Sequence, residues 1–107
     1  MQVQNISQKQ ILVSNLIQAK DLLTKTRGLI GKKKGEALYF TSRFGIHSFG
    51  MTYPLFVLVC DDQLTVRKIV ANFKPNSLLF WNPAWQHIFE LPAEKYQVQI
   101  GDRLQIK

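Results

Sequence analysis

Residues 55–60 read Leu-Phe-Val-Leu-Val-Cys, which is the longest unbroken apolar run in the chain. Six residues are too few to span a membrane as a helix, which takes about 20, so we expect no membrane span. An apolar run of this length instead fits a strand that is covered on both faces. Asp61, Asp62 and Gln63 then predict a hairpin turn into a second strand over Thr65–Asn72. The stretch therefore predicts a sheet with an inner strand over Leu55–Asp61.

Shorter segments on either side also have the apolar patterning of strands. They are Gln10–Val13, Leu16–Ala19, Ala37–Thr41, Ile46–Met51, Gln86–Leu91 and Arg103–Ile106. The first two are either two short strands around a turn at Ser14-Asn15 or one bent strand. Gly101-Asp102 predicts another turn before the last strand.

One segment, Leu22–Ile30, has apolar residues at helical spacing. Asp21 is suited to cap its first turn, and Gly31 is suited to end it. The elements together predict one mainly β (α+β) domain over residues 1–107. We expect a small β-sandwich or partly open barrel, with one short helix near the N-terminus covering one side or end.

The chain is strongly basic, with a net charge of +7 from 14 basic and 7 acidic residues. Residues 1–53 hold eight basic and two acidic residues, whereas residues 54–107 hold six and five. This asymmetry fits an anionic partner such as nucleic acid or a lipid surface, and the alternative is a solubilising surface. A single cysteine and an N-terminus without a signal sequence indicate the cytoplasm, although a removed leader would leave the same sequence.

Several segments, in order along the chain, resemble an uncharacterised prokaryotic family, domain of unknown function 192 (uncharacterised protein family 0127). They are Arg27-Gly28-Leu29-Ile30-Gly31, Gly35-Glu36-Ala37-Leu38-Tyr39-Phe40, His47-Ser48-Phe49-Gly50-Met51, Pro54-Leu55 through Asp61-Asp62, Pro75, Glu90-Leu91-Pro92 and Gly101-Asp102. The chain departs from the family at residues 49–53, where many members have Trp-Met-Lys-Asn-Thr, and at Phe56, where many have Asp. The resemblance implies a mainly β domain and brings no substrate or cofactor.

The resemblance singles out four polar residues, Arg27, His47, Glu90 and Asp102. In a functional interpretation some of them line a cleft, where His47 or Glu90 moves a proton. In a structural interpretation Arg27 pairs with Glu90, and Asp102 hydrogen-bonds its own turn. Glu90 lies among apolar residues, so a partly buried carboxylate there would need a partner.

Metal and thiol chemistry have little support in the sequence. The two histidines are forty residues apart, and Asp61 and Asp62 are explained by a turn, so we expect no metal and no cofactor. Cys60 ends an apolar strand and fits a small buried side chain. A Cys–His nucleophile with His47 or His87 is the alternative.

Two features could contact a partner. One is the basic stretch with Lys25, Arg27, Lys32, Lys33 and Lys34, a candidate anion-binding site. The other is the segment from Phe80 to Trp85, which carries two tryptophans. Exposed, the two features would form a stacking platform beside a phosphate-attracting patch, and buried, the tryptophans would close one end of the core.

The sequence therefore predicts no specific activity. The leading hypothesis is a non-enzymatic binding or accessory domain, with an unidentified protein or anionic partner. Its candidate surface comprises His47, Phe49, Met51, Trp81, Trp85 and Glu90. The alternatives are a small enzyme with a His47/Glu90 pocket and an electrostatic nucleic-acid binder.

Overall fold

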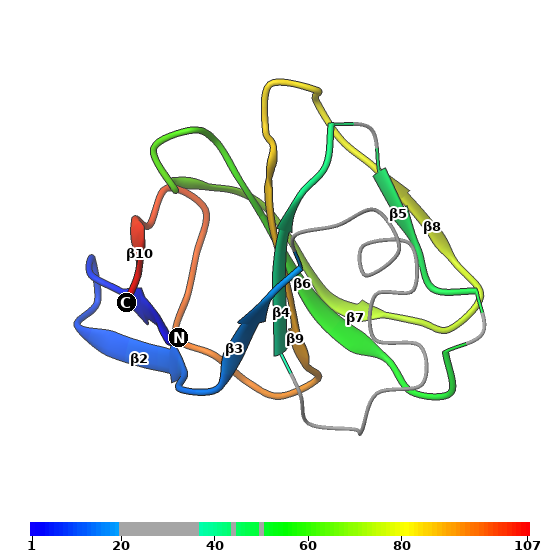
Figure 1. Cartoon of the computed structure of the whole chain (residues 1–107), viewed down its shortest axis with the longest axis horizontal. Coiled ribbons are helices and arrows are strands. Elements are labelled where there is room, and N and C mark those ends of the chain that lie inside the picture. Colours follow the sequence, from blue (N-terminus) through cyan, green and yellow to red (C-terminus); the bar gives the residue numbers. More distant parts are fainter. Residues whose placement is uncertain (20–36, 44, 50) are drawn as a thin grey trace.

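The computed structural model describes residues 1–19, 37–43, 45–49 and 51–107. The described residues form three β-sheets and contain no helix (Figure 1). A five-stranded sheet has the order β3 (Leu16–Gln18), β4 (Ala37–Thr41), β9 (His87–Pro92), β6 (Leu55–Cys60) and β7 (Val66–Phe73). A three-stranded sheet has the order β10 (Leu104–Ile106), β1 (Val3–Asn5) and β2 (Gln10–Val13). The third sheet is a two-stranded ribbon of β5 (Gly45–His47) and β8 (Leu78–Phe80).

The prediction of a mainly β chain is confirmed, and none of the three sheets closes into a barrel over the described residues. The predicted helix over Leu22–Ile30 lies outside the described residues. No helix in the described part of the chain is long and apolar enough to cross a membrane.

The apolar run at residues 55–60 forms β6, and all six of its residues are buried. The strand pairs antiparallel with β9 on one side and with β7 on the other, as expected of an inner strand. Successive side chains point to opposite faces of a strand, so β6 contributes to two separate cores. Phe56 and Leu58 belong to one core, and Val57 and Val59 belong to the other.

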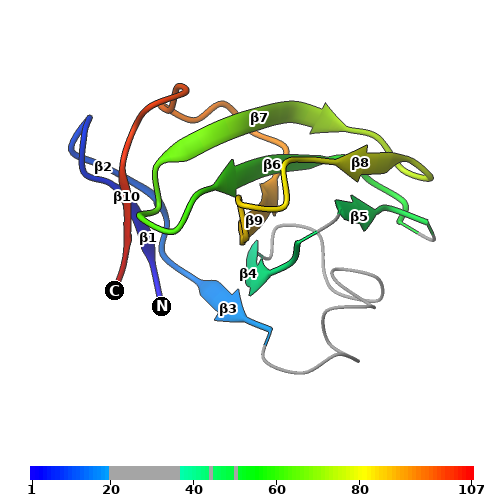
Figure 2. The ribbon, with the colours of Figure 1, turned by 90° about the horizontal axis from the view of Figure 1, so that it is seen from above.

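Each core is completed by a different small sheet. Val3 of β1 and Leu104 of β10 pack into the first core, on one face of the five-stranded sheet. Ile46 of β5 and Leu79 of β8 pack against the second core, on the opposite face. Figures 1 and 2 accordingly show the three-stranded sheet and the ribbon on opposite sides of the five-stranded sheet.

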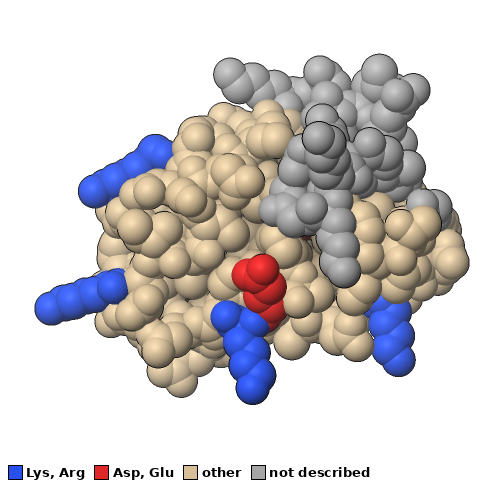
Figure 3. All heavy atoms as spheres, turned by 90° about the horizontal axis from the view of Figure 1, so that it is seen from below, with Lys and Arg blue, Asp and Glu red and all other residues tan. Residues whose placement is uncertain are grey.

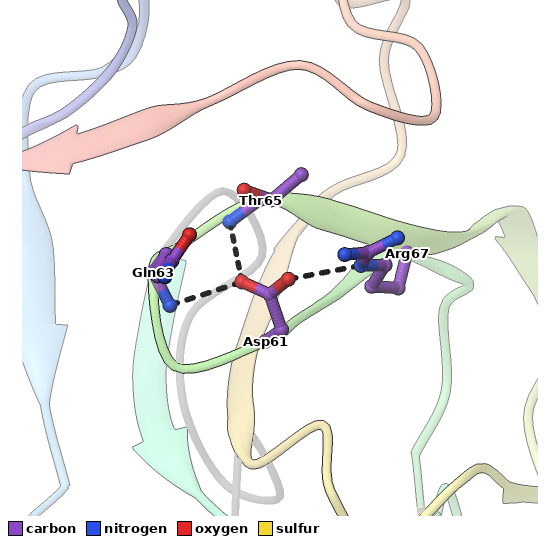
Figure 4. Close-up of polar contacts among 4 residues, drawn as sticks. All are labelled: Asp61, Gln63, Thr65 and Arg67. Atoms are coloured by element: carbon purple, nitrogen blue, oxygen red, sulfur yellow. Dashed lines mark hydrogen bonds and ion pairs between the residues drawn. The ribbon is translucent and has the colours of Figure 1, made fainter.

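The predicted hairpin turn after β6 is confirmed, and Asp61 holds it together (Figure 4). One carboxylate oxygen accepts hydrogen bonds from the backbone N–H groups of Gln63 at 2.9 Å and Thr65 at 3.0 Å. The other accepts a hydrogen bond from Arg67 Nε at 2.9 Å. Both oxygens therefore already have donors, which supports the turn over a cation site.

The predicted turn at Gly101-Asp102 is also confirmed, and Gly101 has a φ of 95°, which favours glycine. The buried Asp102 carboxylate accepts the Gln99 N–H of its own turn at 2.9 Å. It also accepts hydrogen bonds from Asn5 Nδ2 at 2.8 Å and Gln8 Nε2 at 2.7 Å. Burial alone would raise the pKa of Asp102, but these three hydrogen bonds outweigh burial and lower it. Asp102 thus ties the C-terminal turn to the β1–β2 hairpin.

Three details differ from the sequence prediction. The strands β1 and β8 were not predicted, and the strand expected over residues 46–51 ends at His47. It ends there because the Ser48 carbonyl accepts the Met51 N–H and the Asn76 N–H, which turns the chain. The turn at Ser14-Asn15 exists, but β2 and β3 belong to different sheets, and β3 pairs parallel with β4.

Candidate binding surface

The β5–β8 ribbon has one face on the core and one face in solvent. Its register places Gly45 opposite Phe80, Ile46 opposite Leu79 and His47 opposite Leu78. Residues opposite each other share a face, so Ile46 and Leu79 point together to the second core. On the other face, Leu78 is 58% exposed and Phe80 is 65% exposed.

Phe49 extends this outer face beyond the end of β5. Its ring stacks on the exposed His47 ring, with centroids 5.0 Å apart and planes at 23°. The Phe49 N–H also donates a hydrogen bond to His47 Nδ1 at 3.2 Å. Phe49 is itself 48% exposed. We call His47, Phe49, Leu78 and Phe80 the ribbon face.

Gly45 allows the Phe80 ring to lie close to the opposite strand. A Cβ at Gly45 would sit 2.4 Å from the Leu79 carbonyl oxygen and 2.9 Å from Phe80 Cδ1. Both distances are shorter than ordinary contacts, so a side chain there would displace Leu79 or Phe80. The glycine is therefore needed for the geometry of the ribbon face.

Two buried residues anchor the ribbon from behind. Ser48 Oγ donates a hydrogen bond to the Lys74 carbonyl at 2.6 Å and accepts the Ser77 N–H at 2.9 Å, which fixes the approach to β8. Trp81 directly follows β8, and its Nε1–H donates to the Ser42 carbonyl at 3.3 Å. These hydrogen bonds hold the backbone of the ribbon in place, and with it the residues whose rings are exposed.

The two segments that form the ribbon and its flanks carry basic residues and no acidic ones. Neither residues 41–54 nor residues 73–86 contain Asp or Glu. Exposed Arg43 lies two residues before Gly45, at the Phe80 end of the ribbon. Exposed Lys74 lies near the His47 end, because its carbonyl bonds the Ser48 side chain. Cations therefore flank both ends of an uncharged aromatic strip.

The structure separates the six residues of the predicted surface. His47 and Phe49 are exposed and lie together, and Trp85 is half-buried against the second core. Met51, Trp81 and Glu90 are buried, so they do not form part of an exposed surface. Of the two alternatives for the tryptophans, the buried one fits Trp81: the residues from Leu78 to Trp81 alternate, which places Phe80 outward and Trp81 inward.

Sequence reasoning missed Leu78, and it included Phe80 only as the first residue of the Phe80–Trp85 segment, outside the predicted surface. The segment from Leu78 to Trp81 is apolar throughout, so no polar residue indicates which face of the strand is exposed. Only pairing with β5 decides which two of them point to solvent.

Glu90 lies on the second-core face of β9, opposite Leu38 on β4 and Val57 on β6. It is only 4% exposed, and burial raises its pKa to about 7. His47 lies on the β5–β8 ribbon and Glu90 lies on the five-stranded sheet, so the two side chains belong to different sheets. The predicted Arg27–Glu90 pair involves a residue outside the described ranges.

Cys60 is fully buried on β6, directly opposite His87 on β9. Burial, and then the neighbouring Asp61 charge, raise the pKa of the Cys60 thiol. His87 Nδ1 hydrogen-bonds the Tyr39 hydroxyl at 2.6 Å. Because a nucleophilic cysteine needs an accessible thiolate, this environment supports the interpretation of Cys60 as a buried core residue.

An open hollow of about 320 Å³ lies on the opposite side of the molecule, around the β1–β2 hairpin. Its lining includes Asn5, Ile6 and Ile11, with Lys9 as its charged residue. The Asn5 amide already donates to Asp102 and to the Gln97 carbonyl, so it is not free to donate to a ligand in the hollow.

The basic stretch with Lys25, Arg27, Lys32, Lys33 and Lys34 lies outside the described residues. On the face seen in Figure 3, the described Lys and Arg side chains stand apart and do not merge into one basic patch. On that face, the positive charges of the described residues would therefore attract an anionic partner from scattered positions and not from one patch.

Two solved structures share this fold. One is a protein of unknown function from Novosphingobium aromaticivorans DSM 12444, with a TM-score of 0.80 and 16% identity over 98% of this chain and 82% of that chain. The other is a proposed transcription regulator from Sinorhizobium meliloti 1021, with a TM-score of 0.80 and 21% identity over 97% of this chain and 89% of that chain. No family model and no curated protein matches the chain. At these identities the likeness shows the fold and not the activity.

Proposed function

We propose that this chain is a non-enzymatic binding domain that recognises its ligand with the ribbon face. The observation that carries the proposal is the outward exposure of Phe49, Leu78 and Phe80 on a ribbon whose other side is anchored in the core. Contiguous apolar side chains in solvent are unfavourable, and such patches commonly mark binding sites. The exposed rings favour a flat ligand. The flanking cations Arg43 and Lys74 favour a ligand that is also anionic.

The environments of the acid–base candidates favour binding over catalysis. Glu90 is enclosed by apolar neighbours, and Cys60 is a buried thiol with a raised pKa. An unpaired thiol also fits the cytoplasm, where thiols stay reduced. Membership of domain of unknown function 192 is likewise proposed, on the segments quoted above. The Sinorhizobium meliloti protein, a proposed transcription regulator, is compatible with a binding role.

The proposal is tested with 1-anilinonaphthalene-8-sulfonate, a flat anionic dye that becomes fluorescent in apolar sites. We expect saturable binding that is lost in the double variant Phe49→Ala/Phe80→Ala. The matched control is Ile11→Ala/Ile100→Ala, which removes two exposed apolar side chains elsewhere. Both variants should keep a melting temperature near that of the wild type, since about half or more of each of the four side chains is already in solvent. Equal dye binding by the two double variants would contradict the proposal.

A further inference from the structure

The ribbon face is small for a protein partner. An aromatic side chain has about 150–250 Å² of surface, so each half-exposed residue here offers roughly 100 Å². The four residues together offer on the order of 400 Å², whereas a stable protein–protein interface covers about 800 Å² on each partner. The area suits a few flat groups better than a folded partner.

The shape of the face also suits flat groups. The His47 and Phe49 rings are already stacked on each other at 5.0 Å, and the Phe80 ring lies over a glycine on the same ribbon. Each ring is held by a strand or by a neighbouring ring, so little conformational freedom is lost when another ring stacks on it. Nucleic-acid bases stack on such exposed side chains without regard to their sequence.

The charges around the face favour an anionic backbone. Arg43 and Lys74 stand at opposite ends of the ribbon, and the two segments that form the ribbon and its flanks, residues 41–54 and 73–86, contain no Asp or Glu. A strand rises about 3.3 Å per residue, so Gly45 and His47 are about 7 Å apart along β5. A chain of bases crossing this short strip would bring its phosphates toward both cations.

We infer that the ribbon face binds single-stranded nucleic acid, with bases stacked on Phe49 and Phe80 and phosphates attracted by Arg43 and Lys74. This inference rests on the proposed function, because it names the ligand of the same surface. The ribbon face would contact the flat faces of the bases, and the two cations would contact the phosphates. Neither contact involves the base edges that differ between sequences, so binding is tolerant of sequence.

The inference is tested by fluorescence anisotropy with a labelled single-stranded DNA and RNA of mixed sequence, each about 12 nucleotides long. We expect Phe80→Ala and Phe49→Ala each to weaken binding about fivefold or more, because each removes one stacking surface. Ile100→Ala is the control for a lost exposed apolar side chain and should bind as the wild type does.

The two cations are tested through salt dependence between about 50 and 200 mM. Each phosphate contact on a single strand contributes about 0.7 to the slope of log affinity against log salt, so Arg43→Gln/Lys74→Gln should reduce the slope by about 1.4. The control Lys95→Gln/Lys107→Gln removes the same charge from exposed positions elsewhere and should change the slope less.

The outcomes separate the inference from the proposed function. Oligonucleotide binding that ignores the Phe49 and Phe80 substitutions would overturn the inference. No oligonucleotide binding, together with dye binding that Phe49→Ala/Phe80→Ala abolishes, would also overturn it and leave the proposed function standing. That result would redirect the search to an anionic aromatic ligand or an acidic peptide. Failure of both probes would remove both proposals.

Discussion

Glu90 illustrates how one residue departs from its surroundings. It occupies an inward position of β9 between Leu38 and Val57, where the strand pattern calls for an apolar side chain. Burial favours the uncharged acid, because moving a carboxylate out of water is costly. This raises the pKa of Glu90 from its ordinary value of 4.5 to about 7. Near neutral pH, the protonation state of this one side chain is therefore linked to folding.

The direction of the linkage follows from proton binding. Between pH 4.5 and pH 7 the folded chain holds the Glu90 proton and the unfolded chain releases it, so stability falls as the pH rises. The shift corresponds to about 3 kcal/mol. Glu90→Gln, which stays uncharged, should remove this part of the pH dependence and be more stable than the wild type at pH 8.

Urea unfolding at pH 5 and pH 8 measures the effect of Glu90, with the exposed Glu94→Gln as control. A Glu90→Gln variant with the same loss of stability between the two pH values as the wild type would show that another group is responsible.

At the scale of elements, the β6–β7 hairpin depends on one aspartate. Asp61 accepts three hydrogen bonds across a turn in which Leu64 has a φ of 59°, a conformation that costs energy for a residue with a side chain. Burial opposes ionisation of Asp61, but the bonds from Thr65, Arg67 and Gln63 outweigh it and lower its pKa. The ionised form therefore stabilises the turn.

Asp61→Ala should destabilise the fold by about 1–2 kcal/mol at neutral pH, because it removes hydrogen bonds to a charged acceptor. The lowered pKa means that this stabilisation is present above the pKa of the unfolded chain and is lost as the pH falls. Asp62→Ala is the matched control, since Asp62 is the exposed neighbour in the same turn. Thermal unfolding at neutral pH compares them, and equal melting temperatures would contradict the assigned role of Asp61.

The ribbon depends in the same way on Gly45. Gly45→Val would force a side chain against the Leu79 carbonyl and the Phe80 ring, at an expected cost of about 1–3 kcal/mol. Because Trp81 follows Phe80 directly, we expect its buried indole to become more exposed and the tryptophan emission to shift to longer wavelength. Gln10→Val, at an exposed strand position in β2, is the control. Unchanged emission and stability for Gly45→Val would show that the ribbon tolerates a wider separation.

At the scale of the whole molecule, the first core encloses the single cysteine of the chain. Cys60 is at 0% exposure on an inner strand, and burial raises the pKa of its thiol. Its reaction with a thiol reagent therefore requires opening of the five-stranded sheet.

We expect Cys60 in the folded protein to react with 5,5′-dithiobis(2-nitrobenzoic acid) at least about 100-fold more slowly than in guanidinium chloride, in keeping with a folded state that opens rarely. The absorbance of the released thiolate measures both rates. Rapid modification of the folded protein would contradict the closed packing around β6.

Much of the sheet structure could be predicted, because local patterning carries it. The apolar run of β6, the Asp61 turn and the Gly101-Asp102 turn are specified by residues adjacent in sequence. The short strands β1 and β8 were not predicted, because each has three residues, one apolar and two polar in β1 and all apolar in β8, which is too few to show a period. Of the candidate site, His47 and Phe49 were predicted as surface residues, Phe80 was only part of a candidate segment, and Leu78 was not identified.

The sequence by itself determined that this chain is mainly β, where its longest strands and tightest turns lie, and that its charge is positive. These properties depend on neighbouring residues and on sums over the chain. The tertiary structure alone decided which apolar residues face solvent. Phe80 and Trp81 are adjacent and similar in sequence, yet pairing of β8 with β5 exposes one and buries the other. The ribbon face arises from contacts between segments about 30 residues apart, and such contacts leave no local pattern.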